Sequence, residues 1–235
     1  ISTVLDNFRL IKNIENISFD FLFVSGLPSI RGLKSSLQGG LYRIYGNFNK
    51  YKIERKYSGN CHSLLVNKNS IFITDVNEGI VKLDKNGKIL AKVKIQENLR
   101  PHGITTRDYK SFYLCLTDDD SIIHVNMKGR ILRKYKIKSQ NTNDLVPRHH
   151  VNDICYYNKN LYVSMFSVNG TWKSGKYDGG IIKINLNSGN MKTQVSQLSM
   201  PHNILKDNKK MYFCDSYKGR LIENKFNIKF QSNGF

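Results

Sequence analysis

The phrase Pro101-His102-Gly103-Ile104 decides the fold, because three related phrases occur elsewhere in the chain. They are Cys61-His62-Ser63-Leu64, His150-Val151-Asn152-Asp153-Ile154 and Pro201-His202-Asn203-Ile204. Each places an imidazole or an amide just before an apolar strand, and a second strand rich in aromatic residues follows. The spacing is 40 residues from His62 to His102, then 50 to Asn152 and 50 to His202. Propeller blades repeat with a similar period of roughly 40 to 50 residues.

Runs rich in Ile, Val, Tyr and Phe, separated by Asn, Asp and Gly, predict strands along nearly the whole chain and no ordinary amphipathic helix. The clearest unit predicts strands at 62–66, 70–76, 79–84 and 89–95. Further units follow at 102–138, 152–198 and from 202 onward, and a less regular unit precedes them at 21–57. We therefore expect one all-β propeller domain over residues 1–235, with five blades of four antiparallel strands, or six if the ends have been cut.

The chain is strongly basic, with 37 Lys and Arg against 18 Asp and Glu and a formal net charge of +19. This charge favours anionic partners, although the lysines are dispersed and a merely solvated basic surface is the alternative interpretation. Nucleic acid is not an expected partner, because no RNP-like or helix-turn-helix signature is present. The chain also lacks the GxSxG, P-loop, GxGxxG and HExxH motifs of serine hydrolases, nucleotide-binding proteins and zincins.

Four cysteines, Cys61, Cys115, Cys155 and Cys214, lie in or beside predicted strands and form no CxxC pair. We expect buried free thiols, which favours a reducing compartment such as the cytoplasm. No run approaches the roughly 18 to 20 apolar residues of a membrane span. The chain starts at Ile1 rather than Met, which is compatible with trimmed ends and leaves a lost signal peptide open. The sequence does not indicate an oligomeric state.

The repeated polar residues predict one shared site, because the first strand of every blade lines the central axis of a propeller. Neutral imidazoles suit a divalent ion, and Zn, Fe, Mn and Ni cannot be distinguished here. Asn152 orients the ligand and lies two residues after His150, so strand alternation predicts that both point to the same side. The alternative is a polar channel without metal. The predicted metal ligands are His62, His102, His150 and His202, and Asn13 is the candidate equivalent in the first blade.

Other candidates surround this site. Arg100 and Arg148 precede the third- and fourth-blade positions and suit a carboxylate or phosphate. A long insert at 167–179 carries Trp172, the only tryptophan, which either caps the propeller edge or stacks on a ligand. The predicted acid–base groups are His150, Asp178 and Tyr177, and the predicted substrate contacts are Arg100, Arg148, Asn152, Trp172 and Lys173.

Several polar residues fall outside the predicted site. We expect His124 and His149 to serve packing or the surface. Asp75, Asp118 and Asp215 recur at the end of the second strand of a blade, where a short acceptor satisfies turn amides. Asp153 should point to the face opposite Asn152.

The motifs also carry a resemblance to known families. His150-Val151-Asn152, Asp178-Gly179-Gly180 and Leu198-Ser199-Met200-Pro201-His202, together with Leu161-Tyr162-Val163, Trp172 and Asp215-Ser216-Tyr217-Lys218-Gly219, resemble a bacterial propeller family of unknown function. Its hallmark is the Leu-Ser-Met-Pro-His segment, and the match covers about residues 148–222. More distantly, the Pro-His-Gly-Ile and Pro-His-Asn-Ile phrases resemble those of the gluconolactonase, NHL-repeat and virginiamycin B lyase propellers.

The resemblance implies a divalent metal at the axis and either lactone hydrolysis or elimination of a C–O or C–N bond. This chain offers mainly His where gluconolactonases use Glu, Asn and Asp, so a lyase-like site is the nearer analogy. The leading hypothesis is a metal-dependent lyase or isomerase, before a hydrolase, acting on a small anionic sugar or carboxylate metabolite. The alternative is a non-catalytic propeller that binds an acidic glycan or a protein partner through its basic face and the Trp172 insert.

Overall fold

The computed structural model of the chain describes residues 17–26, 39–95, 99–137, 148–207, 209–224 and 227–232. Asn13, the candidate equivalent of the histidines in the first blade, lies outside these residues. The described strands form five antiparallel sheets, of which the first has three strands and the others have four. Strands that are consecutive in the chain are neighbours in every sheet. This meander, together with the repeat of about fifty residues, is typical of a propeller.

The strands of the sheets are as follows. The first sheet contains β1 (Ser18–Ser25), β2 (Gly40–Asn47) and β3 (Tyr51–Ser58). The second contains β4 (Cys61–Val66), β5 (Ile71–Asp75), β6 (Gly79–Leu83) and β7 (Ile89–Val93). The third contains β8 (Pro101–Thr106), β9 (Ser111–Leu116), β10 (Ser121–Asn126) and β11 (Ile131–Lys136). The fourth contains β12 (Val151–Tyr157), β13 (Asn160–Met165), β14 (Gly179–Asn185) and β15 (Met191–Leu198). The fifth contains β16 (Pro201–Asp207), β17 (Lys210–Asp215), β18 (Arg220–Glu223) and β19 (Asn227–Gln231).

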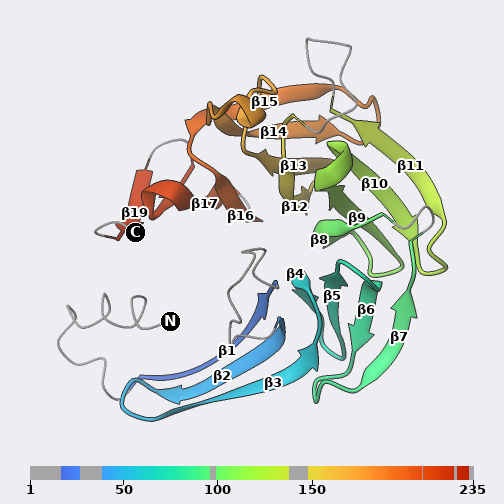
Figure 1. Ribbon diagram of the computed structural model, residues 1–235, viewed down its shortest axis with the longest axis vertical. Helices are drawn as coiled ribbons and strands as arrows, with labels where there is room; N and C mark the ends of the chain where they lie inside the picture. The colour runs from blue at the N-terminus through green and yellow to red at the C-terminus, as the bar shows by residue number, and fades with distance from the viewer. Residues whose placement is uncertain are drawn as a thin grey trace.

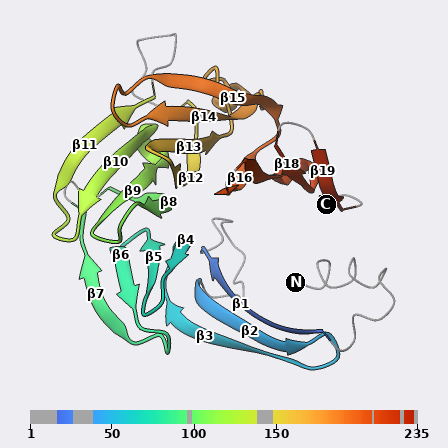
Figure 2. The same ribbon diagram turned by 180° about the vertical axis from the view of Figure 1, so that it is seen from behind.

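The five sheets stand side by side around a common centre, as Figures 1 and 2 show from opposite sides. Strands β4, β8, β12 and β16 lie innermost, and β7, β11 and β15 lie at the rim. Consecutive inner strands contact one another, from β4 to β8, from β8 to β12 and from β12 to β16. The prediction of a five-bladed propeller is confirmed, and the first strand of blades two to five lines the centre.

The core consists of four apolar clusters, each filling the space between two neighbouring sheets. Between the third and fourth sheets, for example, Cys115 and Ile122 pack against Val163 and Ile184, and all four are fully buried. The clusters arise because strand residues alternate between the two faces of a sheet, so each sheet can contribute to both neighbouring clusters. Burial on both faces explains why the central strands of the blades are continuously hydrophobic in sequence.

The fourth and fifth sheets differ in the exposure of the face that points toward the next blade. Ile181 and its pairing partner Val195 are 0% and 4% exposed where the fourth sheet meets the fifth. The matching pair in the fifth sheet, Leu221 and Phe230, is 36% and 46% exposed, and Leu205 on β16 is 58% exposed. No sheet among the described residues covers this face.

Helical structure is confined, in the described parts of the chain, to short 3-10 turns. They are η3 (Thr117–Asp119), η4 (Trp172–Ser174) and η5 (Ser216–Lys218). None of the described helices has the length and apolar character needed to cross a membrane. All four cysteines are free thiols, with Cys61 and Cys115 buried and Cys155 and Cys214 half-buried.

Candidate functional site

Every inner strand of blades two to five has an irregular register at the repeated polar residue or directly after it. In the second blade Cys61 pairs with Asp75 and Ser63 with Thr74, so His62 is an extra residue between them. The register also shifts between Pro101 and Ile104, between Val151 and Asp153, and between His202 and Leu205. A β-bulge re-aims the side chain at its position and is common beside binding sites. The repeat therefore places His62, His102 and Asn152 in bulges, and His202 directly before one.

His62 and His102 form the first half of the site. Their ring centroids lie 4.3 Å apart, with the ring planes tilted by 37°. The His102 ring is fixed from the next blade, because its Nδ1 lies 2.8 Å from the carbonyl oxygen of Asn152. Gly26, directly after β1, packs against His62, since a Cβ at this glycine would stand 3.3 Å from the His62 Cε1 atom. Three blades and the end of β1 thus surround this pair.

His150 and His202 form the second half, together with two aromatic residues. The His150 ring stacks on Phe166 at 4.1 Å between centroids, and Trp172 meets it edge-on at 4.6 Å. His202 contacts Phe166 as well, with the ring centroids 5.2 Å apart in an edge-to-face arrangement. Sequence reasoning missed Phe166, which directly follows β13 and carries no polar signal of function.

Hydrogen bonds determine which nitrogen of two rings carries the proton. The Nδ1 atom of His202 lies 2.9 Å from the carbonyl oxygen of Met200 and 3.0 Å from the Ser216 hydroxyl. A carbonyl oxygen only accepts, so Nδ1 is the donor in both His102 and His202. In the neutral ring the Nε2 atom of each then has a free lone pair. Such a nitrogen can accept a proton or bind a metal ion.

All four rings of the cluster favour the neutral state. Burial lowers the pKa of His102 from 6.5 to about 3, and the nearby His62, His202 and His150 lower it further. The pKa of His150 falls to about 4, again mainly through burial and then through His202 and Lys173. Burial also lowers the pKa of His62 and of His202. At neutral pH the site is therefore a group of unprotonated imidazoles held close together.

Asn152 lies within the site but does not follow simple strand alternation. The side chain is fully buried, its Oδ1 atom accepts the Ser164 hydroxyl, and its Nδ2 atom has no partner among the described residues. His150 precedes β12 and has a left-handed backbone, with φ of 52°. The alternation argument that linked the directions of His150 and Asn152 therefore does not apply. Asp153 faces the fifth sheet, where its carboxylate accepts the amide of Ile204 at 2.8 Å.

Asp120 anchors the segment that leads to His150. Its carboxylate accepts the backbone amides of Arg148, of His149 at 2.8 Å and of His150 at 2.9 Å. Asp75 and Asp215 satisfy turn amides as predicted, for example that of Asn77 at 2.8 Å and that of Ser199 at 2.5 Å.

Asp118 differs from its repeat equivalents, because it is exposed and pairs with Arg100 instead of a turn amide. Sequence reasoning selected Asp118 from its position after the second strand, whereas the chain uses Asp120 for the amides of the next blade.

The insert between β13 and β14 is organised around Asp178. Its carboxylate accepts the Asn169 amide at 2.5 Å and the Thr171 hydroxyl at 2.9 Å. Burial raises the pKa of Asp178, but hydrogen bonds with Ser167, Thr171 and Asn169 outweigh it and lower the pKa overall. The carboxylate thus holds the loop that brings Trp172 against His150. Lys173 lies with its Nζ atom 4.4 Å from the Trp172 ring, and Tyr177 is 46% exposed.

The other predicted residues have defined places. Arg100 is exposed and forms an ion pair of 2.7 Å with Asp118, and Arg148 is half-buried beside Gly170. His124 stacks on Tyr113 at 4.3 Å, outside the cluster. His149 is 2% exposed, and its Nδ1 atom lies 2.9 Å from the carbonyl oxygen of Ser167. Both histidines therefore serve packing, as predicted.

The cluster is not a preformed metal centre. Among the residues that the structure describes, no three His, Cys, Asp or Glu side chains come together in a group that could hold an ion. The four histidines are arranged as two neighbouring pairs, with Phe166 between the members of the second pair. Their donor chemistry nevertheless fits a borderline divalent ion, because Nε2 lone pairs on neutral rings are the ligands that such ions prefer.

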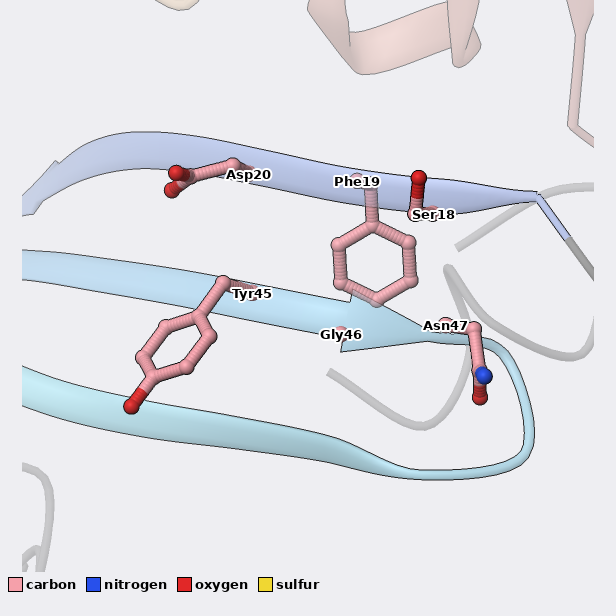
Figure 3. Close-up of a pocket in the computed structure, with 6 residues that line it drawn as sticks. All are labelled: Ser18, Phe19, Asp20, Tyr45, Gly46 and Asn47. Atoms are coloured by element: carbon pink, nitrogen blue, oxygen red, sulfur yellow. The ribbon is translucent and has the colours of Figure 1, made fainter.

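A pocket lies elsewhere, in the first sheet, where β1 begins and β2 ends (Figure 3). Its lining is Ser18, Phe19, Asp20, Tyr45, Gly46 and Asn47. The charge of Asp20 is already matched by Arg43 at 2.7 Å, which also lowers the pKa of this carboxyl. The pocket contains none of the repeated polar residues.

Comparison with solved structures agrees with this architecture. The chain is similar to virginiamycin B lyase from Staphylococcus aureus, with 16% identity over 81% of this chain and 61% of the lyase, and a TM-score of 0.50. It is also similar to a gluconolactonase-like protein, with 9% identity, coverage of 73% and 63%, and a TM-score of 0.52. Regucalcin from Agrobacterium tumefaciens, a calcium-binding protein, shows 13% identity, coverage of 69% and 52%, and a TM-score of 0.50.

These similarities confirm the expected likeness to the lyase and gluconolactonase propellers at the level of the fold. The chain spans less than two thirds of the length of each of these three proteins. No protein-family model matches the chain, and no curated protein matches it.

Proposed function

We propose that the four-histidine cluster, made of His62, His102, His150 and His202, is the reaction centre of a metal-dependent lyase or isomerase. The observation that carries the proposal is the chemical state of the rings. Two Nδ1 atoms are bound to backbone carbonyls, which leaves their Nε2 atoms unprotonated. The lowered pKa values keep the rings neutral at physiological pH. A channel filled with protonated histidines would have no such basic nitrogens.

His62 and His102 are the residues that would hold the ion, and the Nε2 atom of His202 would be a third candidate nitrogen. When bound, a divalent ion supplies a Lewis acid that polarises a carboxylate or carbonyl oxygen of the substrate. The fixed His102 ring is the anchor of this set, because its bond to the Asn152 carbonyl restricts rotation. Calcium binding by regucalcin, a protein of similar fold, is compatible with an ion in this type of propeller.

His150 is the general base in this proposal. No hydrogen bond joins its ring to any other described residue, so its nitrogens are available to a substrate. Phe166 and Trp172 hold the ring on two sides and keep it neutral. In an elimination the base takes a proton from the carbon beside the carboxylate. The electron pair of that C–H bond forms a C=C bond to the neighbouring carbon, whose C–O bond breaks, and the leaving oxygen keeps the electron pair of the C–O bond.

The substrate in this proposal is a small anionic sugar or carboxylate metabolite. The net charge of +19 attracts anions toward the molecule. Lys173 brings a positive charge close to His150, as its effect on the His150 pKa indicates. Arg148 adjoins the segment that Asp120 anchors, and Arg100 is held by Asp118 at the surface. Lys173 is therefore the better candidate for the anion contact.

Metal content and thermal unfolding of untagged protein test the proposal. We expect about one ion per chain and a raised unfolding temperature on addition of Zn, Mn, Fe or Ni, since a ligand that binds only the folded state stabilises it. His102→Gln should abolish both effects. His124→Gln is the matched control, because His124 lies outside the cluster. If the wild-type protein binds no ion and its unfolding temperature does not change, the enzyme proposal is wrong and the non-catalytic binding propeller takes its place.

A further inference from the structure

Two tyrosines form an exposed aromatic pair between the fourth and fifth blades. The rings of Tyr177 and Tyr217 lie 6.4 Å apart between centroids, with their planes within 20° of parallel. Tyr177 is 46% exposed, and Tyr217 is 70% exposed, the highest value among the large hydrophobic side chains that the structure describes. Neither ring contributes to a core cluster. Packing therefore does not explain their position.

Hydrogen-bonded turns carry both tyrosines. Tyr177 ends the insert that Asp178 holds, and Gly175, with φ of 77°, turns the chain between Trp172 and Tyr177. Tyr217 lies in η5, where its amide donates to the Ser199 carbonyl at 3.1 Å. A tyrosine side chain has only two χ angles, so it loses little entropy when a ligand binds, and it provides a large contact area.

The pair adjoins the histidine cluster from two directions. On the side of the fourth blade, Trp172 of the same insert contacts His150 at 4.6 Å. On the side of the fifth blade, Ser216, next to Tyr217, lies with its hydroxyl 3.0 Å from the Nδ1 atom of His202. Both tyrosines therefore belong to segments that contact the imidazoles of His150 and His202.

Positive charge accompanies the aromatic rings. Lys173 and Lys176 belong to the insert and Lys218 to η5, and all three are exposed. The only acid of the insert, Asp178, is engaged by Asn169 and Thr171. A ligand at the pair thus meets flat apolar faces together with uncompensated cations. Aromatic faces bind the C–H face of a pyranose ring, and lysines bind a carboxylate.

We infer that Tyr177 and Tyr217 form a binding platform for a pyranose ring that carries a carboxylate, the chemical class of a uronic acid. This inference rests on the proposed function, because it names the class of substrate for the same reaction centre. The platform binds the sugar, and the histidine cluster acts on the carbon that carries the carboxylate and on the C–O bond of the neighbouring carbon. Binding to the platform itself does not require the metal ion.

Binding of digalacturonate in metal-free buffer tests the inference. Saturation-transfer NMR detects the bound sugar, and the fluorescence of the single Trp172 gives the Kd. Cellobiose has the rings without the carboxylates, and citrate has the carboxylates without a ring. We expect digalacturonate to bind more tightly than either. Equal affinity for cellobiose or for citrate, or no binding of digalacturonate, would overturn the inference.

Variants of the two tyrosines locate the binding. Tyr177→Ser and Tyr217→Ser should each raise the Kd on the order of fivefold, the effect of losing an aromatic contact. Tyr217→Phe keeps the ring and should retain most of the affinity. Tyr51→Ser is the matched control, because Tyr51 is 41% exposed in the first sheet. The inference is wrong if Tyr51→Ser has the same effect, or if Tyr177→Ser and Tyr217→Ser have none. Absence of metal binding with intact sugar binding would contradict only the proposed function.

Discussion

The rings of His62 and His102 lie 4.3 Å apart, although the residues belong to different blades and stand 40 positions apart in the chain. Both occupy a β-bulge at the start of an inner strand. Two unprotonated imidazoles can approach this closely, whereas two imidazolium ions would repel each other. The geometry therefore requires that the pair remain neutral, and this requirement makes the stability of the fold depend on pH.

Acid should destabilise the protein through His102. The folded-state pKa of His102 is about 3, against an ordinary value of 6.5, so the unfolded chain binds more protons between these two pH values. The stabilisation is complete above pH 6.5 and is lost as the pH falls from there toward 3. Urea unfolding between pH 7.5 and about 4 measures it. His102→Gln should flatten the decline.

Asp153 has the opposite effect in the same experiment. Burial raises its pKa from 3.8 to about 6, so this carboxyl alone would favour the folded state on acidification within that window. It is present in both proteins, so its contribution cancels from the difference between the wild type and His102→Gln. If the free energy of unfolding depends on pH in the same way in both proteins, His102 is not a buried neutral imidazole with a lowered pKa.

Trp172 should report the protonation of His150. The two rings meet at 4.6 Å, and an imidazolium beside an indole quenches its fluorescence. Emission should therefore fall on acidification with a midpoint near the folded-state pKa of His150, about 4. The response should disappear in His150→Asn and persist in His124→Gln. A midpoint near 6.5 would indicate that the His150 ring is exposed to solvent.

Gly170 and Gly175 form a matched pair for testing the packing of the insert. Both have a left-handed backbone, with φ of 76° and 77°, so alanine is strained equally at both positions. A Cβ at Gly170 would stand 3.3 Å from the Nε2 atom of His149, whereas Gly175 has nothing within 4 Å. Gly175→Ala should lower the free energy of unfolding by about 1 kcal/mol, from strain alone. Gly170→Ala should cost about 1 kcal/mol more. Equal losses in chemical unfolding would refute this packing.

Asp120→Asn tests the anchor of the segment before β12. The carboxylate accepts three consecutive amides, and hydrogen bonds to a charged group are each worth about 1.5 to 3 kcal/mol. We expect a loss of about 3 kcal/mol in chemical unfolding and weaker contact between His150 and Trp172. Asp118→Asn is the control, since Asp118 pairs at the surface with Arg100 and should cost less than about 1 kcal/mol. If both variants lose a similar free energy of unfolding, Asp120 does not anchor the segment before β12.

The fold was predictable from the sequence because its evidence is periodic. The strands of the second blade, predicted at 62–66, 70–76, 79–84 and 89–95, begin and end within two residues of β4 to β7. The repeated phrases also located the inner strands of blades two to five, since only one described strand of each of these blades begins with a polar residue after Pro, Cys or Val. The approach of His62 to His102 followed from the repeat in the same way.

The details of the site were not predictable, because they depend on backbone geometry rather than on residue type. The bulges at His62 and Asn152 and the left-handed backbone of His150 redirect side chains that alternation would place elsewhere. Phe166 is an ordinary apolar residue whose function comes only from its neighbours. Asp120 stands two residues after the position that the repeat indicated, and only the tertiary structure shows which amides it binds.

The most direct measurement is long-range proton–nitrogen NMR of the histidine rings at pH 7, with and without a saturating amount of zinc. We expect His102 and His202 as neutral rings protonated at Nδ1, since each donates to a backbone carbonyl. Zinc should then shift the Nε2 resonances of His62 and His102 and leave those of His124 unchanged. Protonated rings at pH 7, or cluster resonances that do not respond to zinc, would contradict a neutral metal-binding histidine site at the centre of this propeller.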